Sequence, residues 1–168
     1  VFGQSQSKGM GVVIDSLPPG KILDTEKIEA FMARRRPGTA FSTSRKEEDR
    51  AEIISGLADG RTCGSPLCAV IENRDCRSSD YEKLRDIPRP MHADYPASVK
   101  YGGYNDIAGG GHFSGRLTAP LCFAGAVCMQ LLEEKGIRIG AHISSIGNIS
   151  DINFDPVNTD NETLDRLR

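Results

Sequence analysis

The chain has 168 residues, enough for its own hydrophobic core, and we expect residues 1–168 to form a single domain. The net charge of −2 and an ordinary composition, 38 % hydrophobic and 26 % charged, give no reason to expect nucleic acid or a membrane as partner. No apolar run approaches the roughly 20 residues of a membrane-spanning helix, and the start shows no charged-then-apolar leader. A cytoplasmic protein is therefore expected.

The cysteines support the same compartment. Their number is odd and none forms a Cys-x-x-Cys pair, which favours reduced thiols over disulfides or a metal site. We therefore expect no metal. The five residues are Cys63, Cys68, Cys76, Cys122 and Cys128.

The first elements expected along the chain are a strand and a helix. Residues 9–15 form a short apolar run that ends near a Pro-Pro-Gly turn, as strands often do. A helix should follow, capped by Asp24 or Thr25 and running to about Arg35. Its apolar face follows the helical spacing at Ile28, Phe31 and Met32.

The rest of the chain predicts a mixed α and β order. Residues 51–55 and 67–71 should pair as a hairpin, because an Asp-Gly turn lies between them. Residues 73–112 are rich in charge and glycine and predict a long irregular, functional loop. A second helix should cover 118–135, and alternating isoleucines predict a half-buried strand over 137–146. Both ends look cut, so we expect a piece of a larger protein.

The first candidate cluster for chemistry is cationic. Arginines at residues 34–36 are followed, after a short loop, by Arg45 and Lys46. Guanidinium groups pair bidentately with carboxylate and phosphate oxygens, so this cluster could hold a multiply charged anion. The alternative, which we favour on these residues alone, is a helix C-terminus that carries cations because its dipole attracts them.

The second cluster lies in the long loop, at residues 89–94. His92 could act as a general acid near neutral pH, and Asp94 could orient it. Taken alone, a surface or structural histidine is the better interpretation.

The third cluster is the glycine-rich segment 109–116. Three successive glycines allow close backbone approach, and peptide N–H groups near a helix start suit an anion. The segment matches neither the P-loop nor the dinucleotide fingerprint. The His, Ser and Arg that follow the glycines lead us to favour a phosphate or flavin contact, with a flexible linker as the alternative.

Taken in order and at nearly constant spacing, these clusters resemble the motifs of the chorismate synthase family. The resemblance covers almost the whole chain, which suggests homology more strongly than any one motif could. It rests on segments 2–11, 34–38, 42–47, 71–75, 78–81, 89–94, 100–102 and 109–118.

This resemblance implies an α+β fold, a β-α-β sandwich of the chorismate synthase type that is incomplete here, and assembly as a homotetramer. It also implies conversion of 5-enolpyruvylshikimate 3-phosphate to chorismate and phosphate by anti-1,4-elimination in the shikimate pathway. The cofactor would be reduced FMN, with NADPH as its reductant. The alternative is a truncated or degenerate homologue that binds an anionic ligand without turnover. An unrelated phosphate-binding hydrolase is disfavoured, because no nucleophile motif or metal-ligand spacing is present.

The resemblance assigns site residues by position. It makes His92 catalytic and places Gln6 where the family has a second catalytic histidine. The cofactor-binding segment, Arg-Ser-Ser in many members, is here His112, Phe113 and Ser114. The substrate ligands are Ser5, Arg35, Arg89 and Arg116.

The chain departs from the family pattern in three places. Gln6 can form hydrogen bonds but cannot donate a proton as an imidazolium does. Ala108 stands where the glycine-rich segment is usually preceded by arginine, and the arginine loop is one residue short at residues 39–41. The family's C-terminal half, with most FMN contacts and a catalytic aspartate, lies outside these residues.

Overall fold

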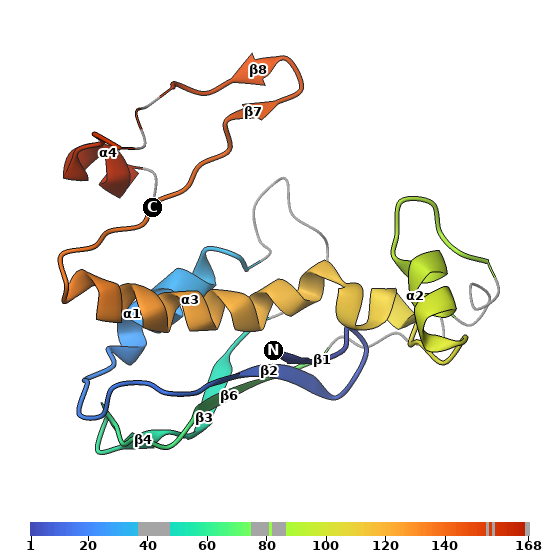
Figure 1. Cartoon of the computed structure of the whole chain (residues 1–168), viewed down its shortest axis with the longest axis horizontal. Helices are drawn as coiled ribbons and strands as arrows, with labels where there is room; N and C mark the ends of the chain where they lie inside the picture. Colours follow the sequence, from blue (N-terminus) through green and yellow to red (C-terminus); the bar gives the residue numbers. More distant parts are fainter. Residues whose placement is uncertain (37–47, 75–80, 82–86, 154, 156, 167–168) are drawn as a thin grey trace. The chain divides into compact units, whose positions relative to one another are not determined.

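The computed structural model of the chain describes residues 1–36, 48–74, 81, 87–153, 155 and 157–166. These form two compact units, Val1–Val127 and Cys128–Arg168. The first unit contains the four-stranded sheet and all of the predicted site residues (Figure 1). One domain over residues 1–168 stays a prediction.

The sheet of the first unit has four antiparallel strands in the order β1-β2-β6-β3. Met10 lies opposite Ile71 and Val12 opposite Ala69, so the central strands present one continuous apolar face. The strands predicted over 9–15, 51–55 and 67–71 are confirmed within a residue. The strands are β1 (Phe2–Gly3), β2 (Gly9–Ile14), β3 (Ala51–Ser55) and β6 (Leu67–Glu72).

The predicted hairpin contains one additional small sheet. Between β3 and β6, strands β4 (Leu57–Ala58) and β5 (Arg61–Thr62) pair around the expected Asp-Gly turn. The sequence predicts the turn but not these two-residue strands, because pairs this short carry no periodicity.

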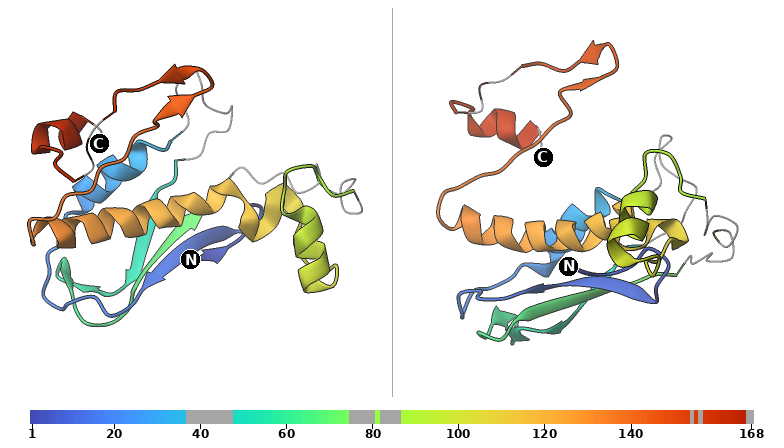
Figure 2. Two further views of the ribbon diagram at one scale, coloured as in Figure 1. Left: turned by 45° about the horizontal axis from the view of Figure 1, so that its top comes forward. Right: turned by 45° about the vertical axis from the view of Figure 1, so that its right-hand side comes forward.

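Helices α1 (Thr25–Ala33) and α3 (Thr118–Glu133) lie on the same side of the sheet (Figure 2). Asp24 caps α1 by accepting a hydrogen bond from the backbone N–H of Lys27 at 3.0 Å, as the sequence predicts. The helices pack on the apolar sheet face through Ile28 and Met32 of α1 and Phe123 and Val127 of α3.

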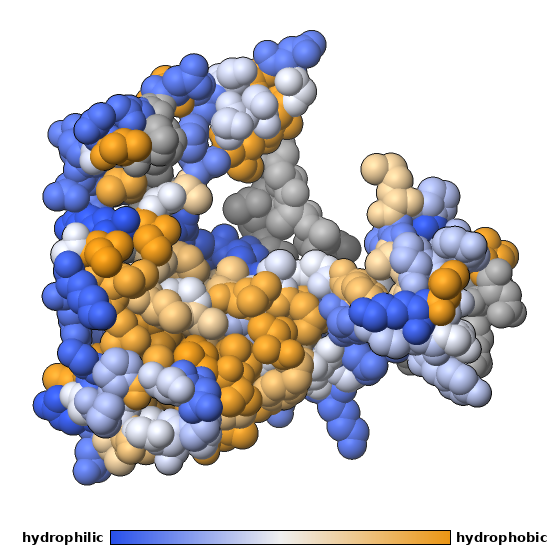
Figure 3. All heavy atoms as spheres, viewed as in Figure 1, coloured by the Kyte–Doolittle hydropathy of each residue, from blue (hydrophilic) through white to orange (hydrophobic). Residues whose placement is uncertain are grey.

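Helix α3 is more apolar than the sequence analysis allows. Residues Gly115–Glu133, 19 in number with a mean hydropathy of 1.3, are long and apolar enough to span a membrane by composition. The expectation of no such run is therefore wrong. A core helix meets the same criteria, and α3 places Phe123 against the sheet. Figure 3 shows apolar side chains gathered over α3, where Leu121 is 55 % exposed.

The region predicted as one irregular loop holds ordered elements. Helix α2 (Asp94–Tyr101) ends at Gly102 in the left-handed conformation, and two 3-10 helices, η2 (Ala108–Phe113) and η3 (Gly115–Leu117), precede α3. The loop prediction is wrong for these residues, because α2 buries only Asp94 and Ala97 and so shows no apolar period in its sequence.

The second unit contains a short hairpin and a terminal helix. Strand β7 (Ser145–Ile146) pairs with β8 (Ile149–Ser150). The prediction of a strand over 137–146 is therefore wrong except at its last two residues. Ile137, Ile139 and Ile143 stay about half exposed or more, so their alternation does not reflect a buried face. Helix α4 spans Asn161–Arg166.

Candidate active site

Arg35 and Arg116 meet on one buried carboxylate, that of Asp49. The guanidinium group of Arg35, just after α1, donates to Oδ2 of Asp49, and that of Arg116, in η3, donates to Oδ1. The side chain of Asp49 has no exposed surface, whereas that of Arg116 is 8 % and that of Arg35 24 % exposed. Arg35 also donates to Oγ1 of Thr118 at 3.3 Å. A buried carboxylate needs such partners, because unpaired it would be strongly destabilising.

Asn73, just beyond β6, links Arg116 to the turn between β1 and β2. Its side-chain oxygen accepts from Nε of Arg116 at 3.2 Å. Its side-chain nitrogen donates to the carbonyl oxygens of Gln4 at 3.1 Å and Ser7 at 2.8 Å. Both ends of the amide are therefore used, and the turn that carries Ser5 and Gln6 is held beside Arg116.

The three glycines of η2 lie against the same turn. They have φ values of 60°, 87° and 54°, a region that favours glycine. A Cβ added at Gly109 would lie 2.5 Å from Oγ of Ser5 and 3.2 Å from Nε2 of Gln6. The backbone N–H of Ser5 donates to the carbonyl of Gly111 at 3.0 Å. The glycines thus permit the close approach that brings Ser5 and Gln6 to this segment.

Arg89 is held on the other side of the glycine run. Its Nε and Nη2 donate to the two oxygens of Asp94 at 2.7 and 2.8 Å, and its backbone N–H donates to Oδ2 at 3.0 Å. The hydrogen bonds from Arg89 lower the pKa of Asp94 to about 2, with a smaller contribution from nearby His92. Nη2 of Arg89 also donates to the carbonyl of Ile107 at 3.4 Å and would lie 3.9 Å from a Cβ added at Gly110.

His92 follows this arginine and is exposed. Its backbone N–H donates to the carbonyl of Arg89 at 3.3 Å, and its side chain is close enough to Asp94 to contribute to lowering the pKa of that carboxyl. The carboxylate of Asp94 is used by Arg89, whereas the sequence suggests that it would orient His92.

The predicted cofactor segment forms an exposed aromatic cluster. The rings of His112 and Phe113 have centroids 4.0 Å apart, and Tyr101 of α2 lies 6.1 and 6.4 Å from them. Ser114 instead faces the helix start, where its Oγ accepts from the backbone N–H of Arg116 at 3.2 Å. His112 and Phe113 are therefore accessible, and Ser114, the next residue, is hydrogen-bonded to the backbone of Arg116.

These contacts join segments far apart in the sequence into one network. It runs from Arg35 through Asp49, Arg116 and Asn73 to the turn with Ser5, and from there through the glycines to Arg89. Among the described residues of this network, three guanidinium groups and two carboxylates come together, and clustered guanidinium groups suit an anion.

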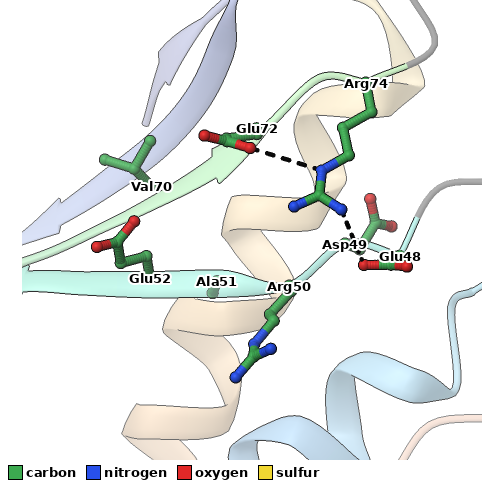
Figure 4. Close-up of a pocket in the computed structure, with 8 residues that line it drawn as sticks. All are labelled: Glu48, Asp49, Arg50, Ala51, Glu52, Val70, Glu72 and Arg74. Atoms are coloured by element: carbon green, nitrogen blue, oxygen red, sulfur yellow. Dashed lines mark hydrogen bonds and ion pairs between the residues drawn. The ribbon is translucent and has the colours of Figure 1, made fainter.

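A cavity of about 450 Å³ borders this network but has the opposite character (Figure 4). Arg74 lies between Glu72 and Glu48, at 3.5 and 3.2 Å, so its charge is already offset. With Glu52 also in the wall, the cavity does not suit an anion. Among the described residues, no three His, Cys, Asp or Glu side chains gather as a metal site would require.

Some predicted residues lie outside the described part of the chain. They include Arg45, Lys46 and the shortened loop at residues 39–41. Arg34 and Arg36 are described but take no part in the network: Arg34 lies 5.4 Å from the ring of Phe31 and Arg36 pairs with Glu29. Of the three described members of this cationic cluster, Arg35 is the one that joins the network.

The roles of Asp49 and Asn73 are not evident from the sequence. Asp49 stands in the strongly charged stretch 47–50, where nothing marks one carboxylate as buried. Asn73 follows a predicted strand, and its two-sided hydrogen bonding depends on segments far away in the chain. Only the position of each residue at the end of a strand could have drawn attention to it.

Comparison of the chain with known proteins identifies its family. The family model described as chorismate synthase matches residues 1–167. The chain belongs to the chorismate synthase family. Curated chorismate synthases from Thermococcus kodakarensis and Pyrococcus abyssi are each 48 % identical to it over 149 residues. The protein from Lachnoclostridium phytofermentans is 43 % identical over 167 residues, or 99 % of the chain.

A solved chorismate synthase also resembles the chain in structure. It is a crystal structure with 29 % sequence identity and a TM-score of 0.65, covering 89 % of this chain and 38 % of the other. This likeness confirms the predicted α+β fold of the chorismate synthase type. The chain spans about two fifths of the length of its relatives, 42 % for the T. kodakarensis protein and 45 % for that of L. phytofermentans.

Proposed function

We propose that this chain is the N-terminal part of a chorismate synthase that converts 5-enolpyruvylshikimate 3-phosphate to chorismate and phosphate. In this anti-1,4-elimination the C–O bond to phosphate and a ring C–H bond break, a second ring double bond forms and a proton leaves. The observation that carries the proposal is the network itself. It collects Ser5, Arg35, Arg89 and Arg116, the residues that the family resemblance assigns to the substrate.

The charge of the network fits this substrate. The substrate carries two carboxylates and a phosphate, which require several cationic donors. Arg35 keeps 24 % of its side chain exposed and Arg89 keeps 21 %, although each is anchored by a carboxylate. Anchored guanidinium groups lose little further freedom on binding and can stabilise the negative charge that develops on departing phosphate.

The residues of the flavin segment fit reduced FMN in part. The exposed rings of His112 and Phe113 offer an aromatic surface, and the glycines beside them permit close approach. We propose that His112, Phe113 and Ser114 contribute to holding FMN, with NADPH as its reductant. Reduced FMN held by these residues would supply reversible electron donation to the elimination.

His92 and Gln6 differ in the proton chemistry they can perform. The exposed imidazole of His92 can donate or accept a proton near neutral pH. Gln6, packed near Gly109, can only donate or accept hydrogen bonds. This substitution favours one alternative function, a degenerate homologue that binds the anion without turnover.

An anaerobic assay of the protein that carries this chain, with photoreduced FMN, separates the two functions. The proposed function predicts chorismate and phosphate in equal amounts while the flavin remains reduced. The alternative predicts saturable substrate binding with neither product. A homotetramer in the cytoplasm belongs to the same proposal, and sedimentation analysis would measure the assembly.

A further inference from the structure

Asp49 is the most deeply buried ionisable group of the network and has no role in the assignment of site residues by resemblance. Its side chain has no exposed surface and each carboxylate oxygen accepts from a different arginine. Its backbone has a φ of 47°, a left-handed conformation that is uncommon outside glycine and more frequent for aspartate. A buried charge on an unusual backbone often serves a site rather than stability.

We propose that Asp49 is a positioning residue, which fixes Arg35 and Arg116 in the geometry that receives an anionic substrate. Two guanidinium groups this close repel each other, and without a carboxylate between them they would separate when no ligand is bound. Asp49 accepts a hydrogen bond from each guanidinium group, so its negative charge holds the two cations together. The inference rests on the proposed function in taking these arginines as substrate ligands.

Neighbouring side chains also restrict the orientation of the two arginines. Arg116 is also held through Nε by Asn73, and Arg35 through Nη2 by Thr118. These contacts orient each guanidinium group from one side, and Asp49 bridges them on the other. Because Arg35 keeps the larger exposed surface, it is the member of the pair that offers a ligand more contact.

Replacing Asp49 with a smaller neutral residue leaves both arginines with a carboxylate-sized space between them. For Asp49→Ala we expect KM for the substrate to rise by about 10²-fold, the size of effect that follows from misplaced binding groups. Sodium formate should restore most of the affinity, since formate supplies a carboxylate, whereas neutral formamide should not. A merely structural loss would respond to neither compound.

Glu48→Ala is the matched control, because Glu48 is the neighbouring carboxylate but its side chain is 73 % exposed and pairs with Arg74. Its KM should stay within about twofold of the unaltered protein, because exposed pairs contribute little. Thermal unfolding with and without formate gives a readout besides activity: only Asp49→Ala should gain stability from formate.

Asp49→Asn keeps the size of the side chain but removes its charge. It serves as the test variant if Asp49→Ala does not fold. It should lose substrate affinity at least tenfold without rescue by formate, since no space is left. The proposal is overturned if KM changes less than twofold in the folded variants, if formate fails to restore folded Asp49→Ala, or if neither variant folds. Failure of the proposed function can be told apart from failure of this proposal. Calorimetric titration measures the substrate affinity of the Asp49 variants even when no chorismate forms.

Discussion

At the scale of single residues, Arg89 and Asp94 make the best-defined ion pair of the site. Two side-chain hydrogen bonds and one backbone hydrogen bond converge on a carboxylate that is 9 % exposed. Because these bonds favour the charged form, the pKa of Asp94 falls from 3.8 to about 2. The folded protein therefore binds this proton less readily than the unfolded chain does.

The depressed pKa predicts acid sensitivity. The stability that Asp94 contributes is fully present above about pH 4 to 5 and is lost as pH falls through about 2. Between pH 5 and pH 2 the free energy of unfolding should fall by about 2 kcal/mol more in the unaltered protein than in Asp94→Asn. Urea unfolding at a series of pH values measures this difference, and parallel curves for the two proteins would show that the pair does not form.

Gln6 predicts a gain of activity on substitution. A histidine at this position could transfer a proton, and general acid catalysis contributes about 10²- to 10⁴-fold in rate. Turnover of Gln6→His should rise toward that range, with KM nearly unchanged because the arginines carry most of the binding. A single-turnover assay with photoreduced FMN measures it, and Gln4→His, on an exposed neighbour, is the control. Rates that agree within about twofold would mean that the proton comes from elsewhere, with His92 the next candidate.

Met91 predicts a gain of stability. It precedes His92 with a φ of 61°, and its side chain is fully exposed. The left-handed conformation costs a non-glycine residue about 1–2 kcal/mol. Glycine avoids this cost, but it loses more conformational freedom on folding, and that loss cancels part of the gain. Met91→Gly should therefore raise the free energy of unfolding by about 0.5–1 kcal/mol. Met91→Ala keeps the Cβ and should give no gain, so a glycine variant less stable than the alanine one would contradict this backbone geometry.

At the scale of elements, the two sides of α3 should differ sharply in their response to truncation. Phe123 is 1 % exposed and packs on the sheet, whereas Leu121, two residues earlier, is 55 % exposed. Phe123→Ala should lower the free energy of unfolding by about 3–5 kcal/mol. Leu121→Ala should lower it by less than about 1 kcal/mol. Equal losses in denaturant unfolding would mean that another surface covers Leu121.

The sequence predicts those elements whose apolar period reflects burial on one side. Helix α1 and strands β2 and β6 show it, since Ile28 and Met32, and likewise Met10 and Val12, face one core. The alternation of Ile137, Ile139 and Ile143 misleads because these side chains face no core in their unit. Helix α2 is missed because only Asp94 and Ala97 are buried on it, too few to give a period.

The candidate site was predictable only where a residue belongs to a family motif. Motif position singles out Arg35, Arg89 and Arg116, which the structure joins into one network. Asn73 lies in the motif segment 71–75, but the resemblance assigns it no role, and Asp49 lies in none of the motif segments. The importance of both residues lies in distant contacts. Asp49 joins residues 14 and 67 positions away, and Asn73 joins residues 43 and 69 positions away.

At the scale of the whole molecule, the proposed function requires that side chains from several distant segments bind one anionic ligand. The arginines lie after α1, in the stretch before α2 and in η3, and the turn between β1 and β2 joins them through Asn73 and the glycines. The site therefore exists only when the sheet and both helices are folded. The chain spans about two fifths of the length of its relatives, 42 % for the T. kodakarensis protein.

Calorimetric titration of 5-enolpyruvylshikimate 3-phosphate into the protein and its arginine variants tests this claim most directly. We expect one substrate per site and affinity losses of about 10- to 100-fold for both Arg35→Ala and Arg89→Ala, because each removes hydrogen bonds to a charged ligand group. Arg74→Ala, in the acidic cavity, should bind as the unaltered protein does. Unchanged affinity in either Arg35→Ala or Arg89→Ala, with the protein folded, would contradict the account, because the two ends of the network would then not hold the same molecule.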